Sequence, residues 1–254
     1  MNPVGPLHGS AQVSDALTIG FASSAVADKV NEDCFGLVTP KEMPEAAERG
    51  TVVALADGGS AGGTGRVASE LTVRTLLQDF YATSPEWSVV RAVDTVLCSV
   101  NDWLYVQNSR DPEFDGVVST LSMLLFGDGS FHLAHVGDTR VYRWRAGVLE
   151  LLTADHIWPR RDMRHVLRRA VGLDSHLVID FMTGNTRAGD VFLIASDGVW
   201  EVLGNAVMDE LLASDLSAEM IACDLVDRSV KSQQRYMGRN DATALVTRIG
   251  GPRG

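Results

Sequence analysis

The amino-acid sequence predicts an α+β fold in which antiparallel sheets carry helices on their outer faces. Apolar, β-rich runs occur in groups along the chain, and the helical patterns lie between or after these groups instead of alternating with single strands. Strict alternation would instead predict a parallel, doubly wound sheet. Short turn-like separations inside the longest group, residues 120–152, favour hairpins and therefore antiparallel pairing.

The predicted strands are short apolar runs bounded by turn residues. They cover residues 17–22, 35–39, 52–56, 120–126, 131–136, 141–144, 149–152, 178–182, 191–195 and 244–249. Gly127-Asp128-Gly129 and Ala146-Gly147 separate neighbouring runs and are typical of hairpin turns. The runs on either side of each turn are therefore expected to pair with each other.

Four helices are predicted from apolar residues that recur at intervals close to 3.6. The first covers residues 66–81. The second begins after Ser84, a typical N-cap residue, with Pro85 at the first helical position. The other two cover residues 207–213 and 218–233. The apolar stripe of each helix predicts that the helix packs against a sheet.

The composition is that of a globular protein with an acidic balance. The 254 residues carry a net charge of −11, with 45% hydrophobic and 22% charged residues. This charge argues against nucleic acid and against a polybasic membrane contact. No apolar run approaches the roughly 18 residues that cross a bilayer, and no secretory signal is apparent. Three distant cysteines without a CxxC pair predict reduced thiols and a cytoplasmic location: Cys34, Cys98 and Cys223.

The two ends of the chain differ in composition from its middle. Residues 1–15 contain two prolines and two glycines and are expected to form a flexible arm, and residues 250–254 a flexible tail. The sequence between them shows no repeat, low-complexity stretch or linker. It therefore predicts a single domain over residues 16–249.

Acidic residues recur where the predicted strands end. Asp57-Gly58 follows the strand at 52–56, and Asp197-Gly198 follows another buried strand in the same way. A glycine after the aspartate lets the backbone approach closely, so its carbonyl oxygen can join the carboxylate as a ligand. One Asp-Gly pair alone is more often an ordinary turn, but its repetition weakens that interpretation.

Three further segments add acidic residues next to predicted strands: Gly137-Asp138, Glu32-Asp33 and Asn240-Asp241. Each alone could be a hairpin turn or a solvated loop. Together they predict carboxylates that converge on one edge of a sandwich and repel one another unless cations are bound. Oxygen ligands suit Mg²⁺ or Mn²⁺, and two such ions can activate a water for attack on phosphorus.

With these residues in place, the sequence resembles the bacterial branch of the metal-dependent type 2C protein serine/threonine phosphatases. This branch includes forms that accompany or are fused to a protein kinase. The matching blocks occur in the family's order and cover nearly the whole predicted domain. They are residues 31–33, 54–58, 119–120, 136–142, 152–156, 167–172, 196–201 and 240–246.

The resemblance implies a four-layer α-β-β-α sandwich of two antiparallel sheets flanked by helix pairs. It also implies hydrolysis of phosphoserine or phosphothreonine in proteins by a water that two Mn²⁺ or Mg²⁺ ions activate. Asp57 would bridge both ions, Gly58 would lend its carbonyl oxygen, and Asp197 would bind one ion. Further implied ligands are Glu32 and Asp33, directly or through water, the block at 240–241, and, for a looser third ion, Asp138 and Glu201.

Two departures from the family pattern change the charge of the site. The family usually carries a phosphate-holding Arg four residues before the Glu of its first block. Here that position is Asp28, so Lys29 or Arg66 would have to substitute. The last acidic ligand falls on Asn240, whose amide still offers an oxygen, while Asp241 could serve after a one-residue shift.

Two other departures concern the periphery of the site. Glu201 stands where the family has Asp, which lengthens the side chain at the third-ion position. The segment from residue 155 to residue 172 is shorter than in many relatives and is basic. Its arginines, Arg160, Arg161 and Arg164, are candidates to receive an acidic phosphopeptide, with plain surface arginines as the alternative.

Three functions fit these residues. The leading interpretation is an active protein serine/threonine phosphatase, with a phosphorylated protein and a cognate Ser/Thr kinase as partners. The alternative is a degenerate member that binds a kinase or phosphoprotein without turnover, which Asp28 and Asn240 would favour. A third interpretation is a metal-dependent hydrolase of small phosphomonoesters on the same scaffold.

Overall fold

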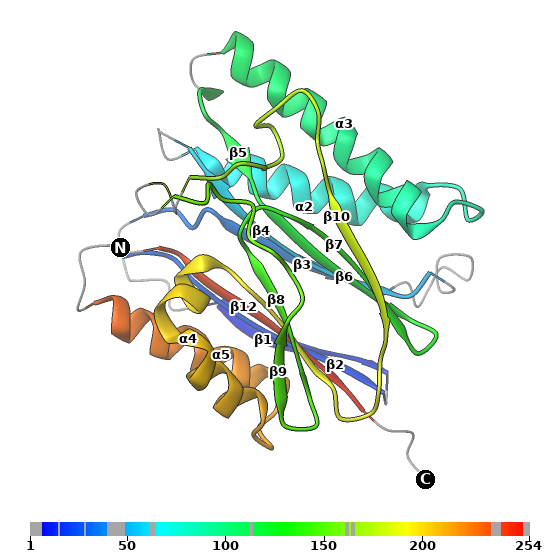
Figure 1. The fold of residues 1–254 in the computed structure, drawn as a ribbon, viewed down its shortest axis with the longest axis vertical. Helices are drawn as coiled ribbons and strands as arrows, with labels where there is room; N and C mark the ends of the chain where they lie inside the picture. The colour runs from blue at the N-terminus through cyan, green and yellow to red at the C-terminus, as the bar shows by residue number, and fades with distance from the viewer. Residues whose placement is uncertain are drawn as a thin grey trace. The chain divides into compact units, whose positions relative to one another are not determined.

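The chain forms two compact units, each built around one six-stranded sheet (Figure 1). The computed structural model describes residues 7–14, 16–27, 29–39, 49–60, 64–111, 114–160, 163, 166–234 and 240–250. Unit 1 comprises Met1–Asp33, Arg140–Ala154 and Thr186–Gly254. Unit 2 comprises Cys34–Thr139 and Asp155–Asn185. Each unit combines segments that lie far apart in the sequence.

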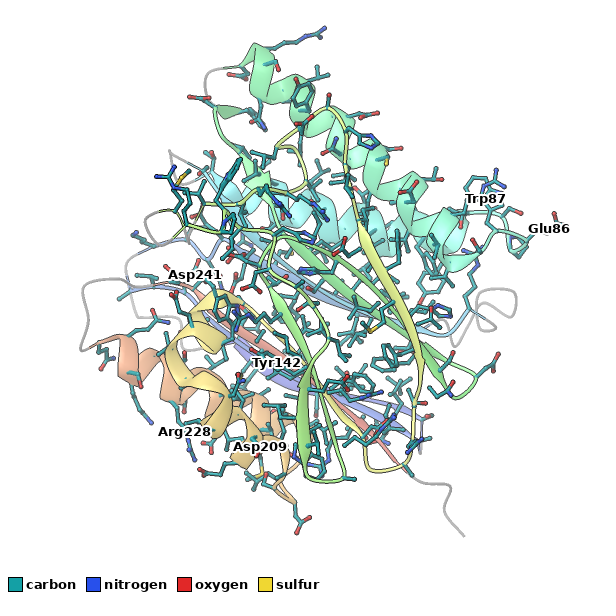
Figure 2. The ribbon with its side chains drawn as sticks, viewed as in Figure 1. Glu86, Trp87, Tyr142, Asp209, Arg228 and Asp241 are labelled. Atoms are coloured by element: carbon teal, nitrogen blue, oxygen red, sulfur yellow. The ribbon has the colours of Figure 1, made fainter. Side chains whose placement is uncertain are left out.

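Unit 1 is an antiparallel sheet with two helices packed on it. Its strand order is β1-β2-β12-β11-β8-β9. The elements are β1 (Leu7–Ser14), β2 (Leu17–Ser24), β8 (Arg140–Arg145), β9 (Val148–Leu151), β11 (Val191–Ala195), β12 (Ala242–Ile249), α4 (Asp197–Leu212) and α5 (Ala218–Gln233). Helix α5 packs on β2 and β12, and the core that results includes the fully buried ring of Tyr142 (Figure 2).

Unit 2 repeats this plan with its own sheet and helix pair. The strand order is β10-β7-β6-β4-β3, and β5 pairs with the end of β4. The elements are β3 (Asp33–Val38), β4 (Thr51–Gly59), β5 (Val118–Ser119), β6 (Leu121–Gly127), β7 (Ser130–Val136), β10 (Asp180–Asn185), α2 (Gly65–Ala82) and α3 (Val89–Arg110). Helix α2 packs on β4, and the core takes fully buried side chains such as Leu76, Phe80 and Leu97 from the helices.

These elements confirm the predicted α+β class with antiparallel sheets and helix pairs. Both predicted hairpin turns are present. Their central residues have positive φ angles, 48° and 68° at Asp128 and Gly129, and 49° and 84° at Ala146 and Gly147. This conformation matches the twist of the flanking strands. Among the described residues, no helix is long and apolar enough to cross a membrane.

Within residues 1–15, where a flexible arm is expected, Leu7–Ser14 form strand β1 on the edge of the unit 1 sheet. Gly9 suggested a loop, but it lies in register with Phe21, whose ring would come within 2.8 Å of any added Cβ. The glycine therefore accommodates an aromatic neighbour on the next strand. Residues 1–6 and 15 lie outside the described part of the chain.

Two helix starts also differ from the prediction. Ser84 and Pro85 form a turn that the Trp87 N–H closes on the Ser84 carbonyl, and Figure 2 marks Trp87 in this connection between α2 and α3. Helix α3 begins only at Val89, where Ser88 accepts a hydrogen bond from the Arg91 N–H at 3.2 Å. Ser84 and Ser88, four positions apart, offer equivalent caps, so local sequence does not choose between them.

Helix α4 begins ten residues before its predicted start at residue 207. It runs from Asp197 with a non-helical Gly204 inside it (φ 71°, ψ 165°). That break disrupts the 3.6-residue periodicity, which is why only the second half was recognised. The early start places the Asp197-Gly198 pair on the first turn of a helix.

The close packing of α5 on β2 makes a testable demand on Gly20. A Cβ on Gly20 would lie 2.1 Å from the Glu219 nitrogen and 2.2 Å from the Ala218 carbonyl carbon. We expect Gly20→Ala to lower the free energy of unfolding by roughly 1–3 kcal/mol, measured by urea denaturation. Gly127→Ala is the control, because its nearest neighbour would be 3.5 Å away. Equal stabilities for the two variants would contradict this packing.

Candidate functional site

The most unusual group in unit 1 is the carboxyl of Asp33, which is only 6% exposed. Ser196 donates its hydroxyl hydrogen bond to Oδ2 at 2.9 Å, whereas Oδ1 is buried without a hydrogen-bond partner among the described residues. Burial raises the pKa of Asp33 to about 7, and the negative charges of Asp241 and Glu32 add to this rise. A buried, unpartnered carboxylate oxygen beside other carboxylates is suited to a cation.

Asp197 sits where strand β11 turns into helix α4. The strand is fully buried and ends at Ala195, Ser196 is the N-cap, and Asp197 is the acidic residue of the first turn. A carboxylate is favoured at this end of a helix by the helix dipole. Its Oδ2 accepts a hydrogen bond from Nδ2 of Asn240 at 2.6 Å. Asp197 and Asn240, both predicted as metal ligands, are therefore in direct contact.

The glycine after Asp197 is required by packing. A Cβ on Gly198 would lie 2.0 Å from the carbonyl oxygen of Asp241. The Gly198 carbonyl oxygen accepts hydrogen bonds from the side chains of Ser229 and Gln233. Gly198 therefore lets the start of α4 approach the 240–241 segment. Its carbonyl oxygen is already hydrogen-bonded to side chains of α5.

The carboxylate of Asp241 is hydrogen-bonded to the backbone of a neighbouring loop. Its Oδ1 accepts from the Val26 N–H and its Oδ2 from the Glu32 N–H, both at 2.7 Å. Charge-assisted hydrogen bonds of this kind are stronger than neutral ones. Asp241, which Figure 2 labels, thus holds the segment that carries Glu32 and Asp33.

In unit 2, Asp57 and Gly58 lie at the end of strand β4. The Asp57 N–H donates to Oγ1 of Thr120 and the Asp57 carbonyl accepts from the Thr120 N–H, both at 2.8 Å. Gly58 pairs with Ser119, which in turn exchanges two backbone hydrogen bonds with Val171. The backbone that carries the half-buried Asp57 is therefore held on both sides.

The remaining predicted residues lie at the edges of these groups. In unit 2, Asp138 is half-buried in the β7–β8 connection, Arg66 pairs with Glu70 at 2.6 Å on α2, and Arg160 is exposed. In unit 1, Glu201 is exposed on α4, and Lys29 is exposed. Asp28, Arg161 and Arg164 lie outside the described residues.

Unit 1 thus brings together Glu32, Asp33, Asp197, Asn240 and Asp241, and unit 2 holds Asp57, Gly58 and Asp138. Over the part of the chain that the structure describes, no three His, Cys, Asp or Glu side chains are gathered in a metal-holding group. The charge and the unpartnered oxygen of Asp33 nevertheless fit a hard divalent cation.

Sequence reasoning missed the hydroxyl groups that support these carboxylates. Ser196 donates to Asp33 and accepts from the Thr243 N–H at 2.9 Å. Ser23 and Thr243 share a hydrogen bond of 2.7 Å, and Asn31 donates to Ser23 at 2.8 Å. A serine directly before an Asp-Gly pair at a strand end is the signal that could have identified Ser196.

Two antiparallel sheets, each with a helix pair and with an aspartate at or just after the end of a strand, are the architecture of a phosphatase-type domain. The chain belongs to the protein phosphatase 2C family, whose model matches residues 23–235.

The relatives are bacterial serine/threonine phosphatases. The chain is 28% identical over 230 residues to the phosphatase PstP of Mycobacterium tuberculosis, covering 84% of this chain but 43% of PstP. It is 25% identical to the phosphatase stp of Listeria innocua, covering 85% of this chain and 89% of that protein. The chain therefore spans less than half the length of PstP and most of stp.

Solved structures share the fold. PppA, described as a regulatory component of the type VI secretion system in Pseudomonas aeruginosa, superposes with a TM-score of 0.76 at 26% identity, covering 95% of this chain and 100% of PppA. The catalytic domain of PstP, solved with two manganese ions, superposes with a TM-score of 0.76 at 24% identity, covering 93% and 99%.

The buried Asp33 makes stability depend on pH. Its pKa is about 7 in the folded chain and 3.8 ordinarily, so the folded state binds an extra proton between these values. Without metal, stability should therefore fall as pH rises from about 4 to about 7. We expect Asp33→Asn to raise the melting temperature in EDTA at about pH 8 and to have little effect at about pH 4. Asp94→Asn, on an exposed part of α3, is the control. An equal gain at both pH values would exclude charge as the cause.

The contact between Asn240 and Asp197 gives a second prediction. Asn240→Asp replaces an attractive amide–carboxylate contact of 2.6 Å by two carboxylates. We expect a lower melting temperature in EDTA and a larger rise on adding Mn²⁺ than in the unmodified protein, because a bound cation relieves the repulsion. Thermal unfolding across a Mn²⁺ titration measures both. Asn205→Asp on the exposed face of α4 is the control, and an unchanged response to Mn²⁺ would contradict the role of residue 240.

Proposed function

We propose that this chain is an active metal-dependent protein phosphatase that hydrolyses phosphoserine or phosphothreonine in proteins. The observation that carries the proposal is the buried Asp33 carboxyl in a chain of the protein phosphatase 2C family. One of its oxygens has no hydrogen-bond partner among the described residues, and two other carboxylates raise its pKa. Such a group is expensive to keep charged in a folded protein unless a cation is bound.

Two Mn²⁺ or Mg²⁺ ions would supply an activated water and neutralise charge on the phosphoryl group when bound. Asp57, Asp197 and Asp33 are the proposed carboxylate ligands, with Glu32 acting through water or directly. Gly58 would lend its carbonyl oxygen, and Asn240 its amide oxygen. Asp138 and Glu201 would serve a third, weaker ion.

Asp241 is assigned mainly a supporting role. Both of its oxygens accept backbone hydrogen bonds, from Val26 and Glu32, so it orders the segment that carries the ligands. A carboxylate oxygen has further acceptor capacity, so these bonds leave room for a ligand role. We nevertheless favour Asn240 as the ligand, because it contacts Asp197 directly.

The phosphoprotein would be received by basic side chains. Lys29 and Arg160 are exposed and Arg66 is engaged with Glu70, so Lys29 is the better substitute for the Arg that Asp28 replaces. Arg160 and Arg161 would contact acidic residues of the substrate. A kinase that phosphorylates the same substrates is the expected cognate partner, and the reduced cysteines favour a cytoplasmic location.

Turnover is preferred over binding alone because the named relatives are phosphatases. The test is hydrolysis of a phosphothreonine peptide with Mn²⁺, with Mg²⁺ and with EDTA. We expect activity only with metal, and a loss of at least about 100-fold in Asp57→Asn, because a ligand charge is removed. Preference for the peptide over p-nitrophenyl phosphate would separate a protein phosphatase from a small-ester hydrolase.

Three results would contradict the proposal. A folded protein that binds Mn²⁺ but shows no turnover would be a binding module. Activity that persists in EDTA, or equal activity in Asp57→Asn, would exclude the metal mechanism. Gly127→Ala, which is expected to fold and lies outside the proposed ligands, serves as the preparation control.

A further inference from the structure

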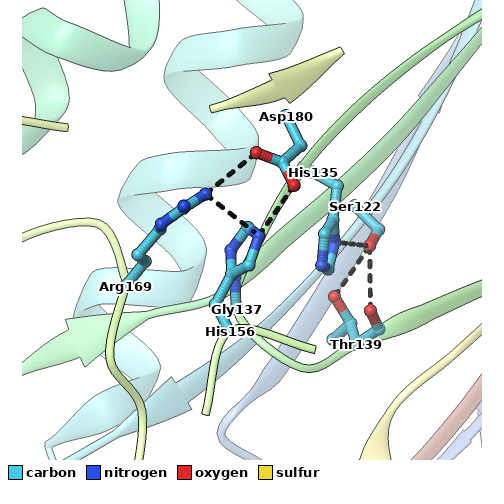
Figure 3. Close-up of polar contacts among 7 residues, drawn as sticks. All are labelled: Ser122, His135, Gly137, Thr139, His156, Arg169 and Asp180. Atoms are coloured by element: carbon cyan, nitrogen blue, oxygen red, sulfur yellow. Dashed lines mark hydrogen bonds and ion pairs between the residues drawn. The ribbon is translucent and has the colours of Figure 1, made fainter. Parts of the chain in front are cut away.

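The turn that carries Asp138 is held on both sides by buried polar side chains of unit 2 (Figure 3). Before Asp138, the Gly137 N–H donates to Nδ1 of His156 at 3.1 Å, and the Gly137 carbonyl accepts from the His156 N–H at 2.7 Å. After Asp138, the hydroxyl groups of Thr139 and Ser122 share a hydrogen bond of 2.8 Å. Asp138 therefore projects from a backbone whose two neighbours are both locked.

His156 can hold Gly137 only as a neutral ring with its proton on Nε2. Because Nδ1 accepts the Gly137 N–H, it carries no proton, and Nε2 donates to Oδ2 of Asp180 at 3.0 Å. The ring is 3% exposed, and burial lowers the pKa of His156 in spite of the opposing effect of Asp180. Asp180 thus selects the tautomer that the turn needs.

Arg169 completes this support from the outside of the unit. Its Nη1 donates to Oδ1 of Asp180 at 2.9 Å, on the oxygen that His156 does not use. Burial alone would raise the pKa of Asp180, but the hydrogen bond from His156 and the charge of Arg169 keep it below its usual range. The carboxylate therefore stays charged and keeps its orientation.

The same turn is packed against the residue that holds Asp57. Gly137 has a φ of 106°, and an added Cβ would lie 2.6 Å from the side chain of Thr120. Thr120 is the partner of both the N–H and the carbonyl of Asp57. His156 thus contacts Gly137, the residue before Asp138. Gly137 in turn packs on Thr120, which holds the backbone of Asp57.

We propose that His156, fixed by Asp180 and Arg169, is a positioning residue that sets the direction of the Asp138 carboxylate for its metal ion. This inference rests on the proposed function, which assigns Asp138 to the weaker ion. Residues that orient a ligand from behind typically change metal affinity by about 10–100-fold when they are replaced. His156 itself touches neither the ion nor the substrate in this proposal.

The test measures Mn²⁺ binding by the electron paramagnetic resonance signal of free Mn²⁺, which needs no turnover. His156→Phe retains an aromatic ring and removes the polar contacts of the imidazole with Gly137, Asp180 and Arg169. We expect His156→Phe to weaken the weakest Mn²⁺ site by about 10–100-fold, and we expect Asp138→Asn to weaken the same site. The double variant should lose no more than Asp138→Asn alone, because both changes act on one group. His132→Phe is the matched control, since His132 is also on unit 2, bonds Thr183 on β10 and does not contact the turn.

Asp180→Ala tests the same idea at a half-exposed position, in case His156→Phe does not fold. Long-range ¹H–¹⁵N spectra should show the Nε2–H tautomer of His156 in the unmodified protein and a mixture of tautomers in Asp180→Ala, with weaker Mn²⁺ binding. Asp180→Asn keeps an acceptor for Nε2–H and should restore most of the affinity.

The outcomes separate the two proposals. Unchanged Mn²⁺ binding in folded His156→Phe or Asp180→Ala, additive losses in the double variant, or a charged His156 ring would overturn the positioning role. Unchanged binding in Asp138→Asn would overturn the metal role of Asp138 itself, and with it the purpose assigned to His156.

Discussion

Repulsion between carboxylates placed close together is the constraint on which this structure depends. Asp33 is buried near Asp241 and Glu32, and the rise of its pKa to about 7 expresses the cost of that arrangement. Folding alone gives no reason to bury such a group, because an apolar residue of the same size would be more stable there. The proposed site for divalent cations would supply the reason, since carboxylate oxygens are the ligands that hard metal ions prefer.

Other polar groups of the protein hydrogen-bond to the acidic residues or to their backbone and hold them in place. Ser196 supports Asp33, Asn240 contacts Asp197, and Asp241 holds the segment that carries Glu32. In unit 2, Thr120 holds the backbone of Asp57 and His156 holds the turn of Asp138. Each of these candidate ligands is thus paired with a neighbour that fixes its backbone or its side chain, as a preorganised site requires.

The departures from the family pattern are compatible with this scaffold. Asn240 stands where the family pattern has an acidic residue, and its amide makes a direct hydrogen bond of 2.6 Å to Asp197. The change lowers the repulsion within the metal-free site at the expense of attraction for the cation. Glu201 keeps a carboxylate at its position on the first turns of α4. The family membership and the retained acidic residues are therefore compatible with the proposed phosphatase activity.

The sequence by itself determined the α+β class, most strands, the hairpin turns and the acidic segments, because these depend on local periodicity, turn chemistry and the order of short blocks. The strand at residues 7–14 was not predicted, because a glycine within it is also typical of a loop. The start of α3 was placed too early, because Ser84 and Ser88 are equivalent N-cap candidates. Only the tertiary structure decided that Asp241 bonds to backbone, that Ser196 supports Asp33, and that His156 with Asp180 holds the turn of Asp138. Those contacts join residues between 19 and 215 positions apart, and such partners are chosen by how strands and helices pack, which local sequence does not encode.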